Sequence, residues 1–556
     1  MSASGQALTR RGWFIGLAVT VLVGMAAGAC ASSDDGRQSA EATDASDEVV
    51  DEGPPVDGGK VVFGVYAETD GWNPHENQWA GPGSVVGSSM MEPLATLDAD
   101  LNPVPWLATK WTPNETFDSW TIELREGVEF SNGQPFDAAA AKLNLDDLDV
   151  APLSSVVFGP VIEGTEVIDD HTVRLDLTRS FATVPNSLLA SPSSFMMAPA
   201  MIEAEDGGTA NPIGTGPFKF LSWEQGSSLT VVKNPNYWQE GLPHLDEIEF
   251  KPVADASAMA SGLLADDIDM VFTNAIAPAT EVTDDFTVLK NWGSEPGLAI
   301  INTYPDIAGE PNPMGNVHAR RAIAYSTDQE ALADFIGEGV ETPTSPFSPD
   351  SKWGMPEADN GYVDRDIDQA KKEITTYEEE SGASGLSITL VAPAGSDYEP
   401  VVQLLQSQWG EAGIETKIQA VETTALIGQV VAGNYQVALF NMYSAPDPDQ
   451  DYHFWTSATA PGPGALNINF TQYTTPELEK NIDIGREDPD FEDRKAAYDA
   501  VVKEINGAAV NIWTYSIPCS IVANGRVHGL AKVREVPFCN YQPKTWLGDL
   551  WISEDL

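Results

Sequence analysis

The chain is poor in the residues and motifs from which enzymes build most active sites and metal centres. Its 556 residues include three cysteines and six histidines, and the histidines are dispersed without the spacing of metal ligands. It contains no G-x-S-x-G nucleophile motif, no H-E-x-x-H zinc motif and no Walker phosphate-binding loop. We therefore expect a protein that is not an enzyme, without catalytic residues, metal or cofactor. A metal site assembled from residues far apart in the sequence stays open.

Basic residues are also scarce. The chain has 29 Lys and Arg against 84 Asp and Glu, which gives a formal net charge of −55. A surface of this sign repels nucleic acid and anionic membranes, so neither is an expected partner. The acidity is equally compatible with a saline habitat and with a general need for solubility. The length of the chain predicts two or three lobes rather than one small domain.

Long apolar runs are missing except at the N-terminus. Residues 1–29 contain Arg10 and Arg11, then an uncharged stretch that ends in small residues before Cys30, as in an export signal. The small residues resemble a lipoprotein lipobox, so we expect lipidation of Cys30; the alternative is a plain signal peptide. The two arginines leave Sec and twin-arginine export both open. Residues 30–58 lack aromatic side chains and are rich in Ser, Ala, Asp and Glu, which predicts a disordered tether.

Export also bears on the other two cysteines. With Cys30 lipidated, Cys519 and Cys539 remain, and an exported protein would pair them as a disulfide. The alternative is two free buried thiols. A lipid at Cys30 would place the folded part on the outer face of the cytoplasmic membrane.

The clearest architecture lies between residues 386 and 440. Strand-like runs at 387–391, 414–420 and 435–440 alternate with helical runs at 401–412 and 423–431. This order predicts a parallel sheet with right-handed crossovers. Ligands bind beyond the carboxyl ends of such strands, which are followed here by residues 394–398, 421–424 and 441–452.

Several local signals concern turns and helix ends. Gly214-Thr215-Gly216-Pro217 predicts a tight corner in which the glycines permit positive φ. A hairpin and then Asn234-Pro235-Asn236-Tyr237-Trp238 follow. Thr327 and Glu330 have the spacing of a capping box, and Asp137 is expected to cap an Ala-rich helix.

These blocks resemble one family. G-T-G-P-F followed by N-x-x-Y-W, the run P-x-L-A-x-x-W to L-R-x-G-V-x-F at 105–130, and R-x-A-I-x-Y near residue 320 occur in the order found in the extracytoplasmic solute-binding proteins of peptide/nickel-type ABC importers. The chain departs from the family pattern at Ala265–Asp269, where the glycine typical of the family is missing. The resemblance implies an α/β, two-lobed periplasmic-binding-protein-like fold of type II, cluster C.

The same resemblance implies how the lobes are divided. The first lobe would span 59–297 with an extra subdomain at about 92–208, the second lobe 298–512, and residues 513–556 would return to the first lobe. Trp106, Trp111, Trp120 and Arg125 would belong to the scaffold rather than the site.

The resemblance also implies function and partners. We expect a monomeric substrate-binding subunit that captures an extracellular solute, first of all an oligopeptide, and delivers it to ABC permease and ATPase subunits. A nickel complex, a heme-like or hydrophobic small molecule is the alternative solute. A secreted peptide-handling chaperone or hydrolase on the same scaffold is the alternative class.

The ligand would lie between the lobes. In the family the loop after the first strand lines the cleft, which selects Trp72, Asn73 and Trp79. The ends of the parallel strands select the residues of the second lobe: Ser396, Tyr398, Asn441, Tyr443, Asp447 and Trp455. Closure is expected to bring Trp72 or Trp79 nearer Tyr443, Phe454 or Trp455; the alternative places Phe454 and Trp455 in the core.

Dipeptide-binding relatives hold the amino end of the ligand with an Asp just before a D-P pair and its carboxyl end with an Arg. Here Ser444, Ala445 and Pro446 precede Asp447-Pro448, and no Arg or Lys lies between Leu386 and Pro400. Charged peptide termini without partners would be costly to bury. We therefore expect the protein not to prefer dipeptides.

Overall fold

The structure is a computed structural model that describes residues 52–77, 79, 81–151, 154–291, 295–395, 398–442, 445–534, 539 and 542–553. The predicted export signal, Cys30 and most of the predicted tether lie outside these residues, as do Ser396 and Tyr443. Among the described helices, none is long and apolar enough to cross a membrane.

The first large sheet has seven strands in the order β12-β20-β11-β1-β10-β9-β8. They are β1 (Lys60–Val65), β8 (Phe218–Glu224), β9 (Ser228–Lys233), β10 (Glu247–Pro252), β11 (Met270–Thr273), β12 (Phe286–Lys290) and β20 (Ser520–Asn524). Strand β1 is parallel to β10 and β11. Strand β20, from the end of the chain, pairs with both β11 and β12. Helix α1 (Gly81–Met90) is buried along its whole length.

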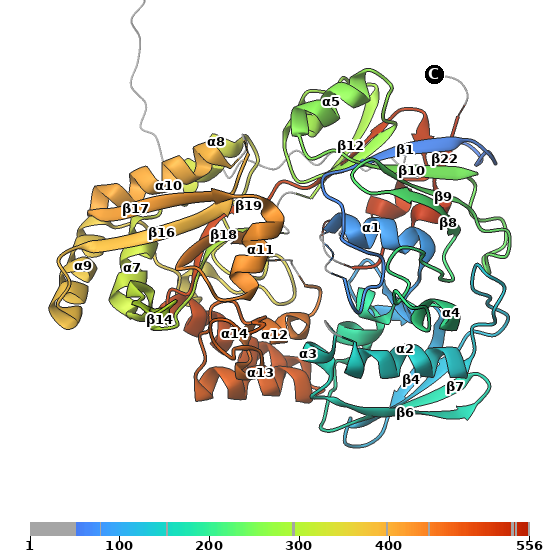
Figure 1. Cartoon of the computed structure of the whole chain (residues 1–556), viewed down its shortest axis with the longest axis horizontal. Helices are drawn as coiled ribbons and strands as arrows, with labels where there is room; N and C mark the ends of the chain where they lie inside the picture. Colours follow the sequence, from blue (N-terminus) through green and yellow to red (C-terminus); the bar gives the residue numbers. More distant parts are fainter. Residues whose placement is uncertain are drawn as a thin grey trace, which may run out of the picture. The chain divides into compact units, whose positions relative to one another are not determined.

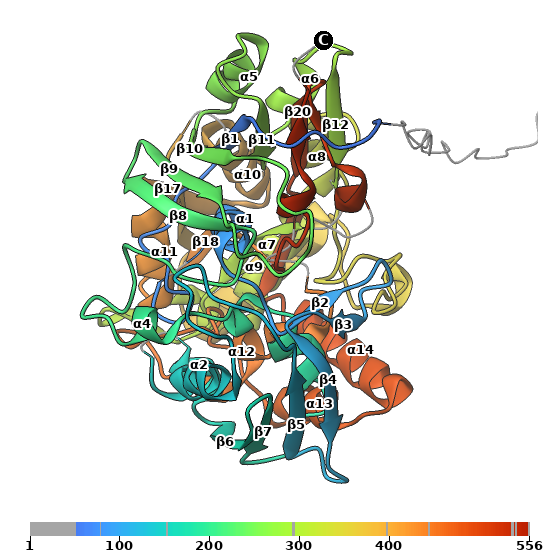
Figure 2. The same cartoon turned by 90° about the vertical axis from the view of Figure 1, so that its right-hand side faces the viewer.

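A smaller sheet carries the segment predicted as an extra subdomain. Its order is β4-β5-β7-β6, with β4 (Ala108–Pro113), β5 (Ser119–Leu124), β6 (Ile162–Asp169) and β7 (Thr172–Leu177). Helix α2 (Ala138–Val150) packs on it, and both views draw this sheet apart from the seven-stranded one (Figures 1 and 2). The side chain of Asp137 accepts a hydrogen bond from the Ala140 N–H, which confirms the predicted cap.

The second large sheet has the order β17-β16-β18-β13-β19. Its strands are β13 (Pro296–Ile301), β16 (Leu386–Pro393), β17 (Ile414–Val421), β18 (Val437–Asn441) and β19 (Asn511–Ser516). Strand β16 pairs in parallel with β17 and β18, which confirms the predicted parallel arrangement. Gly413 ends the intervening helix α10 (Glu399–Ala412) at φ +96°, in the left-handed region that favours glycine.

Helices cover both faces of this sheet, and successive residues of β13 point alternately into two cores. Ala299 and Ile301 face one core with residues of α7 (Val317–Ser326), α8 (Gln329–Ile336), α9 (Ile367–Ser381) and α10. Leu298 and Ile300 face the other core with residues of α11 (Thr423–Val431), α12 (Tyr452–Trp455), α13 (Pro476–Glu487) and α14 (Phe491–Gly507). The remaining helices include α3 (Ser155–Phe158), α4 (Pro199–Ile202), α5 (Ala256–Leu264) and α6 (Ala277–Thr280), and the remaining strands are β2 (Ala95–Leu97), β3 (Pro103–Pro105), β14 (Asp306–Ile307), β15 (Glu310–Pro311), β21 (Val527–His528) and β22 (Trp551–Ile552).

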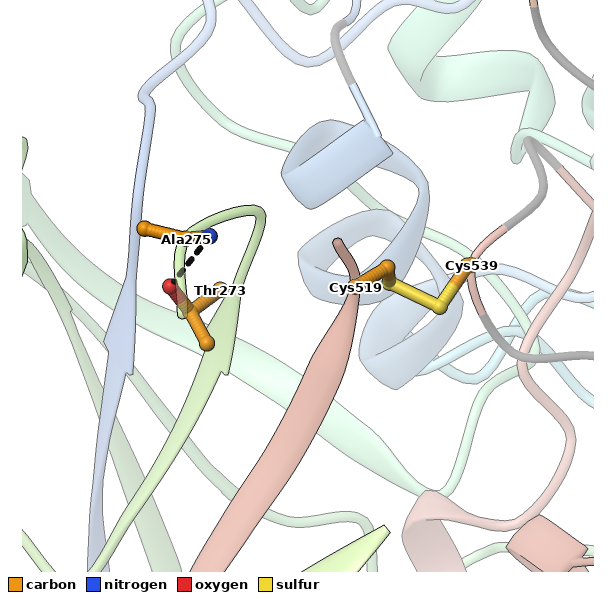
Figure 3. The surroundings of a disulfide bond; sticks show 4 residues. All are labelled: Thr273, Ala275, Cys519 and Cys539. Atoms are coloured by element: carbon orange, nitrogen blue, oxygen red, sulfur yellow. Dashed lines mark hydrogen bonds between the residues drawn. A yellow bond between two sulfur atoms is a disulfide. The ribbon is translucent and has the colours of Figure 1, made fainter. Parts of the chain in front are cut away.

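Two chain segments run between the large sheets, one from β12 to β13 and one from β19 to β20. They touch where the Ile517 N–H donates to the Glu295 carbonyl at 2.7 Å. A disulfide joins Cys519, one residue before β20, to Cys539, with the Cα atoms 5.9 Å apart (Figure 3).

Two of the motifs behind the family resemblance, those around Trp106 and around Tyr237-Trp238, meet at one buried carboxylate. Glu92 Oε1 accepts hydrogen bonds from Trp106 Nε1 (2.9 Å) and Tyr237 OH (2.8 Å), and Oε2 accepts from Trp238 Nε1 (2.9 Å). Burial raises the pKa of Glu92 to about 7, against the lowering effect of these donors. The Arg125 guanidinium lies 4.4 Å from the Trp238 ring centroid. Trp106 and Arg125 are thus held within the first lobe, and their role as scaffold stays a prediction.

The glycines of the G-T-G-P corner are needed for a different reason than predicted. Neither Gly214 nor Gly216 has a positive φ. A Cβ atom would lie 2.4 Å from the Met90 carbonyl oxygen at Gly214 and 2.5 Å from the Met90 carbonyl carbon at Gly216. The corner packs directly on the backbone at the end of α1, and only glycine leaves room for that approach.

Two other local predictions need correction or explanation. Thr327 does not begin the capping box, because the N-cap of α8 is Asp328, whose side chain accepts from the Ala331 N–H. The Thr327 hydroxyl instead donates back to the Ile323 carbonyl at the end of α7. Where the family's glycine is missing, Asp266 takes φ +59° after α5, a left-handed conformation that Asp tolerates better than most residues.

Candidate ligand-binding site

The two lobes meet along a seam that joins residues 179–186, which follow β7, to residues 447–487 of the second lobe. Arg179 Nη1 lies 2.8 Å from Asp483 Oδ1, and Arg179 Nη2 donates to Tyr452 OH at 2.6 Å. The Thr183 hydroxyl donates to Asp449 Oδ2 at 2.6 Å. The segment that carries Arg179 and Thr183 directly follows the last strand of the small sheet, so the chain next to that sheet contributes to the contact between the lobes.

Two of the acidic side chains at the seam are neutralised by arginines from the second lobe. Asp449 Oδ1 lies 2.7 Å from Arg486 Nε, and these side chains are 0% and 4% exposed. The Arg486 guanidinium also lies 3.6 Å from the Tyr452 ring centroid. Burial opposes ionisation of Asp449, but Arg486 outweighs it and lowers the pKa of Asp449 below its ordinary value. Asp447 pairs with Arg494, while its burial raises the pKa of Asp447.

The third acidic side chain of this run has no such partner. Asp451 is 4% exposed, and its side chain forms no hydrogen bond or ion pair with any residue in the described part of the chain. Burial, with the Asp449 carboxylate nearby, raises the pKa of Asp451 well above its ordinary value. Burial also lowers the pKa of the neighbouring His453 to about 4, so this histidine is neutral at pH 7.

An aromatic recess opens at the carboxyl end of β18. The space in and in front of it, open solvent included, is about 480 Å³, and its lining is Ile300, Phe440, Asn441, Met442, Phe454, Trp455, Phe470, Thr471, Tyr473, Leu478, Ile505, Val510 and Asn511. The Phe470 ring lies 5.5 Å from that of Phe440 and 5.4 Å from that of Phe454, measured between centroids. These three rings are half-buried, whereas Trp455 is 4% exposed and part of the core. The recess thus offers partly open aromatic faces to an apolar group.

The first-lobe residues selected from the sequence lie in the core of that lobe. Trp72, Asn73 and Trp79 are 2%, 1% and 7% exposed. Trp79 Nε1 donates to the Gly71 carbonyl and Asn73 Nδ2 to the Gly207 carbonyl, both at 2.9 Å. The Trp72 ring stacks edge-on against Trp223 and also lines a small recess under β1 and β10. Their contact with ligand stays a prediction.

Comparison with known proteins identifies the family. Residues 102–463, more than half of the chain, match the profile described as "Bacterial extracellular solute-binding proteins, family 5 Middle". The chain belongs to this family.

The relatives of this family 5 solute-binding protein have different ligands. The glutathione-binding protein GsiB of Salmonella paratyphi A is 29% identical over 402 residues, which cover 71% of this chain and 75% of GsiB. Among solved structures, AgaA from A. tumefaciens R10 in complex with agropinic acid has a TM-score of 0.78 at 21% identity, covering 90% of this chain and 99% of AgaA. AppA from Bacillus subtilis in complex with a nonapeptide has a TM-score of 0.77 at 19% identity, covering 90% of this chain and 100% of AppA. These likenesses confirm the expected fold.

Family 5 proteins are solute-binding proteins rather than enzymes, and they work with the permease and ATPase subunits of ABC importers. The chain is accordingly the substrate-binding subunit of an ABC importer. Within the described residues, no group of three or more His, Cys, Asp or Glu side chains could hold a metal ion.

The structure brings some of the predicted second-lobe residues together. Asn441 and Trp455 both line the aromatic recess, whereas Tyr398 lies at the start of α10 and packs against the core on the other face of the sheet. Asp447 is 1% exposed and already neutralised, so its role as a ligand contact stays a prediction.

The sequence interpretation missed Asp451 and Phe470. The sequence shows the alternating carboxylates of Asp447, Asp449 and Asp451, but it does not show which of them has an arginine partner. No local pattern placed Phe470 beside Phe440.

Proposed function

We propose that the protein binds an oligopeptide longer than a dipeptide between its lobes, with an apolar side chain of the peptide in the aromatic recess. The observation that carries this proposal is the recess itself, because aromatic faces provide large apolar contact at low entropic cost. The missing Arg or Lys between Leu386 and Pro400 supports a ligand held along its backbone rather than by its carboxyl end. AppA, which shares the fold, is described with a nonapeptide.

Calorimetry tests the peptide proposal directly. Ala-Ala, Ala-Phe-Ala-Phe, tetra-alanine and a Phe-containing nonapeptide would be titrated into the mature protein. We expect the Phe-containing longer peptides to bind more tightly than both tetra-alanine and the dipeptide. A dipeptide that binds more tightly than every longer peptide would contradict the proposal. Mass spectrometry of solutes released on denaturation would reveal a non-peptide ligand, the alternative that the agropinic acid complex of AgaA makes concrete.

A paired substitution tests the role of the recess. Phe454→Ala removes a half-buried ring from the recess, whereas Phe491→Ala removes an exposed ring on α14 that is absent from the recess lining. We expect only the first to weaken binding of the Phe-containing peptides, while tetra-alanine is affected little. Equal losses for both peptides would assign Phe454 a structural role.

Ligand binding is proposed to close the lobes about the segments that join β12 to β13 and β19 to β20. Small-angle scattering with and without bound nonapeptide measures this closure. A smaller radius of gyration at saturation is expected, and an unchanged radius counts against closure. Light scattering in the same buffers would show whether the protein is a monomer.

The finer localisation is also a proposal. The small residues before Cys30 and the acidic segment after it support a lipid anchor on the outer face of the cytoplasmic membrane. Cys30→Ala, expressed in the native host and fractionated, should move the protein from the membrane to the soluble exported fraction. Retention of the variant at the membrane would show that the anchor is something else.

A further inference from the structure

Three aspartates at the seam are paired with arginines. Asp447 pairs with Arg494, Asp449 with Arg486, and Asp483 with Arg179. Asp451 is also buried, at 4% exposed against 1% for Asp447 and Asp449, and its side chain has no hydrogen-bond or ion-pair partner in the described ranges. Native proteins rarely bury a carboxylate without a partner, because an ionised group loses its hydration without compensation.

The position of Asp451 places it at the contact between the lobes. It ends the short helix η5 (Pro448–Asp451), which lies against η1 (Pro185–Leu189) of the first lobe. The adjacent residue, Gln450, touches the first lobe twice: its Nε2 donates to the Asn186 carbonyl at 2.8 Å, and its Oε1 accepts from Gln542 Nε2 at 3.0 Å. Asp451 is therefore the chain neighbour of a residue that bridges the two lobes.

We propose that Asp451 is the counter-charge for a positively charged group of the solute, an ammonium or a guanidinium. This inference rests on the proposed capture of a solute between the lobes, and it adds the charge class of that solute. The three arginines at the seam, Arg179, Arg486 and Arg494, are occupied by other carboxylates, so these residues supply no spare cation. A solute cation would compensate Asp451 only when the lobes close, which couples recognition to closure.

Matched peptides decide whether a cation is recognised and which one. Lys-Phe-Ala-Phe, its N-acetylated form and norleucine-Phe-Ala-Phe would be titrated into wild-type protein, Asp451→Asn and Glu415→Gln. Glu415 is an exposed acid on β17 of the same lobe, so its variant carries the same change in net charge. Loss of affinity on acetylation identifies the terminal ammonium, and loss on replacing lysine identifies the side-chain ammonium.

We expect one of these two changes to weaken binding to the wild type and to Glu415→Gln by at least about tenfold, and to have no effect in Asp451→Asn. Equal discrimination in Asp451→Asn and wild type would overturn the proposal, and so would binding of all three peptides with the same affinity.

Two further measurements keep the result decisive. If no peptide binds the wild type, the oligopeptide proposal fails on its own, and putrescine and agmatine become the probes for Asp451. Loss of amine binding in Asp451→Asn would support the role of Asp451. Amine binding that survives in Asp451→Asn, or no binding of either amine to the wild type, would overturn that role. In ligand-free protein Asp451→Asn should melt at the same temperature as wild type or higher, because no internal pair is lost. A lower melting temperature would reveal an internal partner and overturn the proposal.

Discussion

Breaking the ion pair between Asp449 and Arg486 on one side only should strongly destabilise the second lobe. Asp449→Asn retains the shape of the side chain and an oxygen that can accept from Thr183, but it leaves the Arg486 guanidinium buried opposite a neutral amide. Removing one member of a buried ion pair costs about 3–5 kcal/mol. Because Arg486 also stacks on the Tyr452 ring at 3.6 Å and the Phe181 ring at 4.4 Å, we expect a loss near the lower end, about 3 kcal/mol.

Urea unfolding at pH 7, followed by circular dichroism, measures this loss. Asp483→Asn is the matched control, since it makes the same chemical change at a pair whose members, Asp483 and Arg179, are each 33% exposed. An exposed pair contributes about 0–1 kcal/mol. Equal destabilisation by the two variants would refute the inference that burial makes the difference. Asp449→Leu combined with Arg486→Met should recover much of the lost stability, because it removes both charges together.

Three further predictions concern stability. Reduction of the disulfide, or Cys519→Ser with Cys539→Ser, should lower the unfolding free energy by about 3 kcal/mol, the chain-entropy cost of a loop spanning 20 positions. Urea unfolding with and without reductant measures this loss. No change would show that the disulfide leaves the unfolded state unconstrained. Burial raises the pKa of Glu92 from 4.5 to about 7, so the contribution of protonated Glu92 to the unfolding free energy is complete below about pH 4.5 and is lost as pH rises through 7. Glu92→Gln should remove this fall in unfolding free energy, roughly 3 kcal/mol, when urea unfolding is measured from pH 5 to 8. Gly214→Ala should lower the thermal midpoint, at a cost of about 1–3 kcal/mol, because its Cβ would lie 2.4 Å from the Met90 carbonyl oxygen, and an unchanged midpoint would contradict that packing.

The sequence predicts the parts of the fold whose information is local. The parallel block from β16 to β18 could be predicted because its strands and helices each have a clear period and Gly413 marks a helix end. The glycines of the G-T-G-P corner show the limit. Their presence was informative, but turn chemistry suggested positive φ, whereas the actual cause is the backbone at Met90, which lies over 120 positions earlier.

The candidate site was less predictable, because its chemistry depends on pairings across long sequence separations. Asp449 and Arg486 are 37 positions apart, and Thr183, which also binds Asp449, is 266 positions from it. Asn441 and Trp455 could be selected because Asn441 ends β18 and Trp455 comes after it, but nothing local distinguishes Asp447, which is neutralised, from Asp451, which is not. Which carboxylate in an acidic run is left unpaired is a property of the folded seam.

The acidic groups of this protein would act on a cationic solute at two ranges, and only the short-range effect would be selective. The surface excess behind the net charge of −55 attracts any cation, but salt screens it beyond roughly 8 Å at physiological ionic strength. It can therefore raise association rates without discriminating among cationic solutes. A buried carboxylate such as Asp451 is shielded from salt and acts only on a group that the closed lobes hold beside it. Under the proposed role, salt would govern how fast a solute arrives, and Asp451 how long it stays.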